Sequence, residues 1–422
     1  MFYLINLLLN QRNFAYTNTL PIIKTDTSKI KNLTTILPTF LFLFITNLSF
    51  GQENGCDCIV NLTETTQIIK KSTSYKSQVK KLKREEEFKN WENKIKKEIK
   101  NDSLSTYFCS GYIQKYISFI KDKHNQIYST SKDIKSIIPS YSNTFEQVIN
   151  SEDSISGIYY QGKESILVQK SSDNLWFGIL LESNSKDWKK GMIRLRISRD
   201  VNNSFEIFEF YKNGFLYYQN GINITNGRIH STFWNKNDKY FFNKNHKQNF
   251  KFEKLNSTIN YISIKSLKRS KELIKEADEF YLNIKTKLDN KNLIIDLRNN
   301  GGGSTEQIKP LIKIITKNKS IDKIYVLVNF KTGSAAELGA YLLNKDSRTI
   351  LTGENSRGQL TYGWGNGSIS GNLNCQEIQY DLSRNVTNKK LLQFENIGLS
   401  PEIKLTNQSN WIDQIIELEN KK

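Results

Sequence analysis

The chain has 422 residues, of which 37% are hydrophobic and 24% charged, and its formal net charge is +19. This length allows two or three domains, and the apolar content is enough for packed interiors, which excludes wholesale disorder. Lysines are scattered beside glutamates, as in residues 80–88, without zinc-ligand spacing or a recognisable nucleic-acid module. We therefore expect a solvated basic surface and no nucleic-acid partner, with attraction to acidic polymers or to membrane surfaces left open.

The N-terminal residues follow the order of a secretory signal peptide. Lys29 and Lys31 precede an apolar run over residues 36–45, and small or neutral residues lead to Gly51. The run is shorter than the roughly 20 apolar residues that span a bilayer. We expect residues 1–51 to be an N-terminal extension plus signal peptide, cleaved near Gly51. The apolar patch near the start leaves an over-called start codon and a membrane anchor as alternatives.

Four cysteines fit an exported protein. Cys56 and Cys58 follow the expected cleavage site, Cys109 lies in the next helical region, and Cys375 is near the end. The C-x-C spacing is too tight for a usual zinc knuckle, and no histidine stands nearby to complete a site. We expect a disulfide from Cys56 or Cys58 to Cys109 and no metal.

Helical periodicity follows the cysteines. Between about residues 61 and 127, apolar residues recur at spacings of mostly three, four or seven between charges, which predicts amphipathic helices. The segment 112–120 carries apolar residues on most sides and should be more deeply buried. We assign residues 52–135 to a helical N-terminal domain.

The next segment has the texture of strands. Short alternating runs rich in Tyr, Phe, Trp and Ile are broken by Gly and Asn, as in residues 157–160 and 205–211. We therefore predict an antiparallel β module over residues 136–250. Its role is that of a structural insert or of a substrate-binding part.

Strands and helices then alternate to the end of the chain. Apolar strands at 293–297 and 324–328 are separated from one another and from their neighbours by helices at 270–287 and 307–315. Continuous apolar strands of this kind are typical of a parallel sheet covered on both faces. We predict an α/β core over residues 251–422 and expect the chemistry there.

A glycine-rich segment follows the first of these strands. The residues D-L-R-N-N-G-G-G-S run from Asp296 to Ser304. Consecutive glycines let backbone N–H groups approach a bound anion closely. Because a Gly-Lys-Ser/Thr ending and the G-x-G-x-x-G spacing are both missing, an oxyanion hole fits better than a nucleotide phosphate site.

A serine stands where the second strand turns into a helix. The segment from Val328 to Leu338 passes through Thr-Gly-Ser and then into helix-forming residues. The hydroxyl of Ser334 is therefore expected to be exposed, with the following N–H free at a helix N-terminus. Taken alone, Ser334 is also a good helix N-cap.

Three motifs in one order resemble a known family. The D-L-R-N-N-G-G-G segment, T-G-S-A-A-E after it and T-G-E-N-S-R-G at 352–358 resemble the core of the C-terminal processing peptidases and the tricorn protease, the tail-specific protease domain. The resemblance covers about residues 259–405, with a fainter match in the helices at 61–127. The PDZ module of many processing peptidases is replaced by the β module, which leaves the family's tail recognition in doubt.

The resemblance implies a crotonase/ClpP-like α/β catalytic core, preceded by the helical segment and the β module. It also implies a serine-type peptidase, a hydrolase that acts on protein or peptide substrates without a cofactor. Together with the signal peptide, it implies a bacterial protein of the periplasm or cell envelope. The oligomeric state is left open.

The family's roles can be carried over residue by residue. Ser334 matches the nucleophile that forms an acyl-enzyme, and the N–H groups of Gly302 and Ala335 match the oxyanion hole. The Ser-Lys branch has a lysine where this chain has Gln359, and an amide cannot accept the proton. The tricorn-like Ser-His branch is therefore favoured.

Two further positions complete the expected site. His124, in the segment D-K-H, resembles the histidine of the branch's Asp-Gly-His segment, with Lys123 in place of glycine, and is the expected base. Glu395, in the closing segment F-E-N-I-G-L-S-P-E-I, matches a carboxylate that assists the base. The alternatives are a loop histidine without a task and a solvated loop glutamate.

The remaining polar candidates are given structural roles. We expect Glu337 to support the turn at Ser334, and His230 and His246 to lie at the surface. The function favoured is that of an exported serine peptidase. A peptide- or lipid-binding protein that keeps this fold without catalysis is the alternative, followed by an adhesive or scaffold protein acting through its basic charge.

Overall fold

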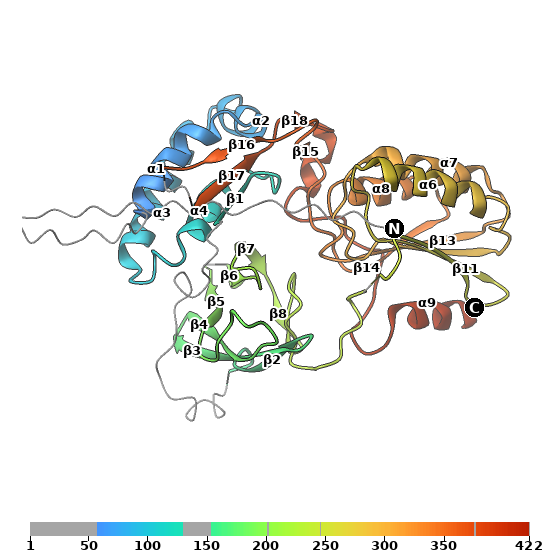
Figure 1. Cartoon of the computed structure of the whole chain (residues 1–422), viewed down its shortest axis with the longest axis horizontal. Coiled ribbons are helices and arrows are strands. Elements are labelled where there is room, and N and C mark those ends of the chain that lie inside the picture. Colours follow the sequence, from blue (N-terminus) through green and yellow to red (C-terminus); the bar gives the residue numbers. More distant parts are fainter. Residues whose placement is uncertain (1–56, 130–152, 201, 245, 375–376, 422) are drawn as a thin grey trace, which may run out of the picture. The chain divides into compact units, whose positions relative to one another are not determined.

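The structure is a computed structural model, drawn in Figure 1, that describes residues 57–129, 153–200, 202–244, 246–374 and 377–421. The predicted signal peptide with its cleavage site, Cys56 and Cys375 lie outside the described residues. Within the described residues, no helix combines the length and the apolar character that crossing a membrane requires.

Helices fill most of residues 58–117. The first begins after Asp57, whose side chain accepts hydrogen bonds from the N–H groups two and three residues later. The longest buries Phe88, Ile95 and Ile99 on one face. The helical elements are α1 (Cys58–Ile69), α2 (Thr73–Tyr75), η1 (Lys76–Lys80, π-helical), α3 (Glu85–Asn101) and α4 (Cys109–Ile117).

A disulfide and a small sheet tie this helical part together. Cys58 in α1 is bonded to Cys109 in α4, which is one of the two pairings that the sequence left open. After α4, strand β1 (Gln126–Ser129) pairs with the C-terminal strand β17 (Ile378–Leu382), which also pairs with β16 (Ile369–Asn372). The segment that carries His124 is thus held by strands from near the end of the chain.

The β module is an antiparallel sheet in which each strand pairs with its sequence neighbour. Burial alternates along the sheet in places, as over residues 195–198, where Leu195 and Ile197 are buried and the residues between and after them are partly exposed. The six strands, in spatial order, are β2 (Gly157–Gln161), β3 (Glu164–Ser172), β4 (Leu175–Glu182), β5 (Ile193–Arg199), β6 (Phe205–Phe210) and β7 (Leu216–Ile222). A two-stranded ribbon of β8 (Ile224–Thr225) and β9 (Arg228–Ile229) follows.

The C-terminal part contains a second six-stranded sheet. Its first pair is antiparallel and the others are parallel, as expected for strands joined by helices. In spatial order the strands are β10 (Phe250–Lys254), β11 (Ile259–Ile264), β12 (Asn292–Asp296), β13 (Lys323–Val328), β14 (Thr349–Gly353) and β19 (Ile403–Lys404).

Helices cover both faces of this sheet, as the apolar strands predict. The helical elements are α6 (Lys271–Ile284), η3 (Thr305–Gln307), α7 (Lys309–Lys317), α8 (Ala335–Leu343) and α9 (Trp411–Asn420). Along β13, Ile324 and Val326 pack into the core under α6, α7 and α8, whereas Tyr325 and Leu327 pack with Trp411 of α9. Successive side chains of a strand alternate between its faces, which is why an unbroken apolar run serves two cores.

Short elements lie on either side of β16 and β17 in the chain. The strands β15 (Tyr362–Gly363) and β18 (Asn385–Val386) pair with each other, and the 3₁₀ helix η4 (Lys389–Phe394) follows. The protein is therefore of mixed α/β class, with several sheets and helices.

The hydrophobic cores cross the expected domain boundaries. One core contains residues of the N-terminal helices, of the β module and of β17, for example Ile113, Ile207 and Leu382. The described residues fall into one compact unit rather than three. The helices and the β module each lack a separate interior because the apolar face of α4 packs directly on β7 and β1.

Candidate active site

Ser334 lies in a tight turn between β13 and α8. Its backbone has φ 51° and ψ −119°, a conformation that is unfavourable for a residue with a side chain and that typically costs about 1–3 kcal/mol. The preceding turn is fixed by Thr332, whose hydroxyl accepts from Asn329 N at 3.0 Å and donates to Leu297 O at 2.8 Å. The strand, the turn and the helix together hold the Ser334 hydroxyl in one place.

The carboxylate of Glu337 stabilises that turn through hydrogen bonds. It is fully buried and accepts from Ser334 N at 2.9 Å, Gln359 N at 2.8 Å, Ser356 Oγ at 2.6 Å and Gly358 N at 2.5 Å. Burial raises its pKa, although these hydrogen bonds act in the opposite direction. Glu337 has the supporting position expected for it, one helical turn after Ser334.

His124 is brought to Ser334 from the other end of the chain. Its Nε2 lies 3.2 Å from Ser334 Oγ, although 210 residues separate them. The ring is buried and lies edge-on to Trp364, whose indole N–H donates to the carbonyl of His124 at 2.8 Å. Asp122 fixes the loop further, because its Oδ1 accepts from the N–H of His124 at 2.9 Å.

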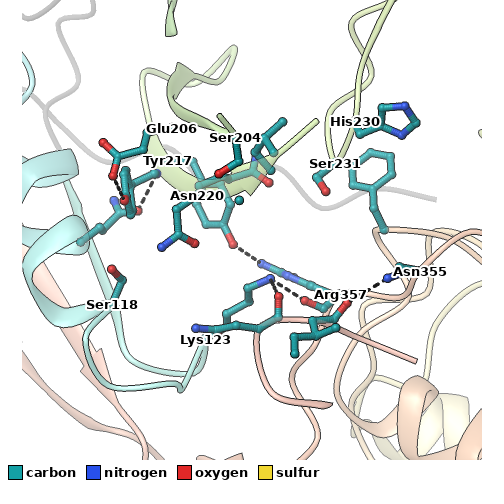
Figure 2. A pocket seen from close by; sticks show the side chains of 18 of the residues that line it. Ser118, Lys123, Ser204, Glu206, Tyr217, Asn220, His230, Ser231, Asn355 and Arg357 are labelled. Atoms are coloured by element: carbon teal, nitrogen blue, oxygen red, sulfur yellow. Dashed lines mark hydrogen bonds between the residues drawn. The ribbon is translucent and has the colours of Figure 1, made fainter. Parts of the chain in front are cut away.

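Gln359 occupies the position where the Ser-Lys branch has its lysine, and it holds the histidine loop. Its side-chain amide donates to the carbonyl of Lys123 at 2.8 Å, while its backbone N–H binds Glu337. The ammonium of Lys123 in turn donates to the carbonyl of Arg357 at 2.6 Å (Figure 2). These contacts join the loop of the histidine to the segment beside the serine.

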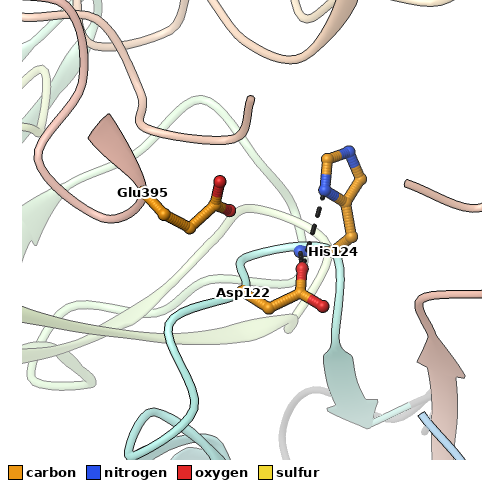
Figure 3. A group of neighbouring side chains, drawn as sticks. All are labelled: Asp122, His124 and Glu395. Atoms are coloured by element: carbon orange, nitrogen blue, oxygen red, sulfur yellow. Dashed lines mark hydrogen bonds and ion pairs between the residues drawn. The ribbon is translucent and has the colours of Figure 1, made fainter. Parts of the chain in front are cut away.

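The buried carboxylates of Asp122 and Glu395 lie next to the ring of His124 (Figure 3). His124 Nδ1 is 3.7 Å from Asp122 Oδ1, and ligand atoms of Asp122, His124 and Glu395 all lie within 4.8 Å of one another. Among the described residues, no hydrogen-bond partner is found for His124 Nδ1, Asp122 Oδ2 or Glu395 Oε1. The other oxygen of Glu395 accepts from the N–H groups of Leu360 and Thr361 at 3.0 and 2.8 Å.

The electrostatics of this group favour the protonated form of Glu395. Burial raises the pKa of Glu395 to about 7, and the charge of Asp122 adds to the increase, while the hydrogen bonds and His124 oppose it. The same three residues have the donor types and spacing to hold a cation, but Nδ1 then could not serve to orient the base.

The expected oxyanion hole is half open. The N–H of Ala335 has no hydrogen-bond acceptor among the described residues, whereas that of Gly302 donates to Asn300 Oδ1 at 3.0 Å. Gly302 has φ +96°, and a Cβ there would lie 2.8 Å from Ala335 N. Glycine at 302 therefore leaves the space above Ala335 N–H free.

Sequence reasoning missed two residues of the site, Asp122 and Trp364. It also wrongly placed His246, which lies outside the site, at the surface. Asp122 could have been found as the acid of the D-K-H segment, but Trp364 carried no signal. His246 is not at the surface: it is 5% exposed, and its ring nitrogens contact Ser263 Oγ and Arg298 O, both at 2.8 Å. The surface prediction failed because its polar sequence neighbours hid its contacts with β11 and the Asp296 loop.

Residues 258–324 match the sequence model of peptidase family S41. The resemblance is therefore to the S41 peptidases. The matched stretch contains β11, β12 and the glycine-rich loop that packs against Ser334. A comparison with curated proteins found no match.

Solved structures are similar to this chain only at low identity and low TM-score. Mature CPAF complexed with lactacystin has 10% identity and a TM-score of 0.40, with 86% of this chain and 97% of that chain covered. The photosystem II D1 C-terminal processing protease has 14% identity and a TM-score of 0.34, with 83% of this chain and 94% of that chain covered. An S41 protease from Bacteroides fragilis NCTC 9343 has 12% identity and a TM-score of 0.36, with 74% of this chain and 90% of that chain covered. At these TM-scores the chemistry of the site has to stand on its own residues.

Proposed function

We propose that this protein is an exported serine peptidase that hydrolyses peptide bonds through an acyl-enzyme on Ser334. The observation that supports this most strongly is the 3.2 Å contact between Ser334 Oγ and His124 Nε2. A serine on a strained strand-to-helix turn, with a buried imidazole at hydrogen-bond distance, is the arrangement that a nucleophile and its base require.

The proton follows a short path in this proposal. Ser334 Oγ attacks the substrate carbonyl while His124 Nε2 takes its proton, and His124 then delivers that proton to the leaving amine. The positive charge that forms on the ring faces Asp122 and Glu395. A water molecule, deprotonated by His124, hydrolyses the acyl-enzyme and restores Ser334.

The oxyanion that forms in the first step needs donors. Ala335 N–H supplies one directly, and Gly302 N–H becomes the second when it exchanges Asn300 Oδ1 for the oxyanion. Loss of one such donor typically lowers the rate about 10²–10³-fold. We infer that substrate binding completes the hole.

Export is inferred from the sequence of the N-terminus. The basic, apolar and small-residue order of residues 29–51 favours a signal peptide. The disulfide between Cys58 and Cys109 agrees with it, because such bonds persist in oxidising compartments such as the bacterial periplasm.

Covalent labelling tests the catalytic part of this proposal. The mature protein is treated with a fluorophosphonate probe, and the adduct is located by peptide mass. We expect labelling at Ser334, none in Ser334→Ala, and labelling at least about 10²-fold slower in His124→Ala. Ser257→Ala, which changes an exposed serine in the turn between β10 and β11, is the matched control and should label like the wild type. A folded wild type that is never labelled at Ser334 would contradict the proposal.

One observation favours the second candidate, a peptide-binding protein without catalysis. The bond from Gly302 N–H to Asn300 Oδ1 leaves the hole with a single free donor. If that bond persists when a substrate peptide is bound, the chain binds peptides but does not cleave them. Binding of a peptide with no turnover and no label at Ser334 would identify this case.

A further inference from the structure

A cavity of about 910 Å³ lies next to the candidate active site without including Ser334 or His124. Its walls come from the segment after α4, from the end of the β module and from loops of the C-terminal sheet. Figure 2 shows the side chains of Lys123, Tyr217 and Arg357 meeting in it. The proposed peptidase mechanism gives this cavity no role.

The lysine and arginine side chains that line the cavity are Lys121, Lys123, Arg228, Lys331, Arg357 and Lys404. Three of them, Lys123, Lys331 and Arg357, have neutral hydrogen-bond partners. Lys123 Nζ donates to the carbonyl of Arg357 at 2.6 Å, Lys331 Nζ to the phenol of Tyr211 at 3.3 Å, and Arg357 to the phenol of Tyr217 at 3.3 Å. Within the described part of the chain, none of the three forms an ion pair with a carboxylate. Three cations without an ion-pair partner therefore share one cavity, and the carboxylates of Glu209, Glu337 and Glu395 act on them only from a greater distance.

The carboxylates in the same cavity are engaged elsewhere. Glu354 lies 2.7 Å from the guanidinium of Arg228, and Glu206 lies 2.6 Å from the ammonium of Lys115. Asp200 accepts hydrogen bonds within its own turn. The acidic residues that line the cavity are Asp122, Asp200, Glu206 and Glu354. The fourth, Asp122, contacts His124, so all of them have partners other than the three cations.

These positive charges shift the pKa values of the neighbouring side chains in the cavity. Burial lowers the pKa of Lys123 and of Lys331, and the nearby Arg357 lowers both further. Burial would raise the pKa of the Tyr217 phenol, but Arg357, Lys123 and Lys331 outweigh it and lower this pKa to about 8. The cavity therefore favours an anion even at the cost of ionising a phenol.

The walls of the cavity are direct neighbours of the catalytic pair. Lys123 precedes His124 in the chain, and its carbonyl is held by Gln359. Arg357 Cδ lies 3.1 Å from the position of a Cβ on Gly333, the residue before Ser334. An anion bound between these cations would lie close to a peptide positioned over Ser334.

We propose that this cavity binds a carboxylate of the peptide substrate, close to the scissile bond, through Lys123, Lys331 and Arg357. The inference rests on the proposed peptidase function and specifies its substrate class. Lysine and arginine form charge-assisted hydrogen bonds with carboxylates, which here replace contacts to neutral groups. An acidic side chain and a free C-terminus share this chemistry.

Matched small probes separate these two sources. We would titrate the full mature chain carrying Ser334→Ala with N-acetyl-glutamate amide (side-chain carboxylate only), N-acetyl-glutamine (terminal carboxylate only) and N-acetyl-glutamine amide (neither), using calorimetry. The near-ultraviolet absorbance of tyrosinate at about pH 8 is a second readout, because a bound anion raises the pKa of Tyr217 and removes its signal. Tyr217→Phe lacks that signal and identifies its source.

We expect one or both carboxylate probes to bind at least about tenfold more tightly than the amide, and to weaken about tenfold or more in Lys331→Met and Arg357→Met. Lys186→Met, which removes the same charge from an exposed loop of the β module, should not change binding. Equal binding of all three probes would overturn the proposal. Binding of inorganic phosphate alone would also overturn it, because it would assign the cavity to a phosphate ligand.

The fluorophosphonate experiment keeps the two proposals apart. A protein that labels at Ser334 but distinguishes no carboxylate probe remains a peptidase, and the cavity inference fails. A protein that binds the carboxylate probes but never labels keeps the anion site, and its role as a substrate subsite is then overturned.

Discussion

Two buried carboxylates lie near the candidate pair, Glu337 beside Ser334 and Glu395 beside His124, and they differ in how many of their oxygens accept hydrogen bonds. Both oxygens of Glu337 accept hydrogen bonds, whereas Glu395 uses only one oxygen and leaves the other directed at the histidine group. Apart from the N–H of Ser334, the donors to both come from one stretch, residues 356–361. Burial alone therefore does not distinguish the two carboxylates, because both oxygens of Glu337 accept hydrogen bonds whereas Glu395 has an oxygen available to the proposed base, His124.

The largest expected effect is on the fully bonded carboxylate. Glu337→Gln keeps the shape but replaces one accepting oxygen by an NH₂ group that faces N–H or O–H donors. Each unsatisfied buried donor costs about 1–3 kcal/mol, so we expect a loss of about 2–6 kcal/mol in unfolding free energy. Urea denaturation measures it. An unchanged midpoint would show that Glu337 does not hold the turn at Ser334.

The next effect concerns pH. Glu395 has a folded-state pKa of about 7, above its ordinary value of 4.5. The folded state therefore binds more protons than the unfolded state between these values, and the contribution to stability is lost as pH rises from about 4.5 to 7. Its size is on the order of 3 kcal/mol. Unfolding free energies of wild type and Glu395→Gln across this window should converge or cross, and parallel curves would argue against the raised pKa.

The same substitution should change reactivity more than fold. In Glu395→Gln the amide oxygen still accepts from Leu360 and Thr361, but a neutral group faces His124 Nδ1. We expect labelling of Ser334 to slow about 10- to 100-fold, less than in His124→Ala because Asp122 remains. The folded fraction, checked by circular dichroism, should stay the same. A labelling rate like that of the wild type would assign the orienting role to Asp122 alone.

The smallest effect is expected at Gln359, which lies in the segment that donates to both carboxylates. Gln359→Ala removes the hydrogen bond to the carbonyl of Lys123 and keeps the backbone bond to Glu337. We expect about 1 kcal/mol of lost stability and a labelling rate lowered a few-fold. Because Gln359 positions the His124 loop, the maximal labelling rate should fall while the half-saturating probe concentration changes little. The reverse pattern would place Gln359 in probe binding.

The sequence predicted the C-terminal α/β part best. Continuous apolar runs and helical periodicity placed the elements over 270–328 within a few residues of α6, β12, α7 and β13, since these signals are local. Motif order also selected Ser334 and His124 as a pair. Their approach to 3.2 Å was beyond local patterns, because it depends on contacts between segments 210 residues apart.

Other features depend on long-range packing that leaves no periodic signal. The pairing of β1 with β17, the single core shared by α4 and the β module, and the burial of His246 all come from contacts between distant segments. The basic cavity is of the same kind, since Lys123, Lys331 and Arg357 look like solvated charges in the sequence. Even the choice of Cys58 over Cys56 required coordinates.

The pairing of β1 with β17 also bears on the order in which the candidate site is assembled. During synthesis, the segment of His124 emerges long before Ser334, but its strand partner, residues 378–381, emerges later than both. Until that partner has been made, β1 lacks the strand with which it pairs, and the loop of His124 has only earlier contacts such as the one from Gln359. The candidate pair of Ser334 and His124 is thus completed by residues that follow both of them in the chain.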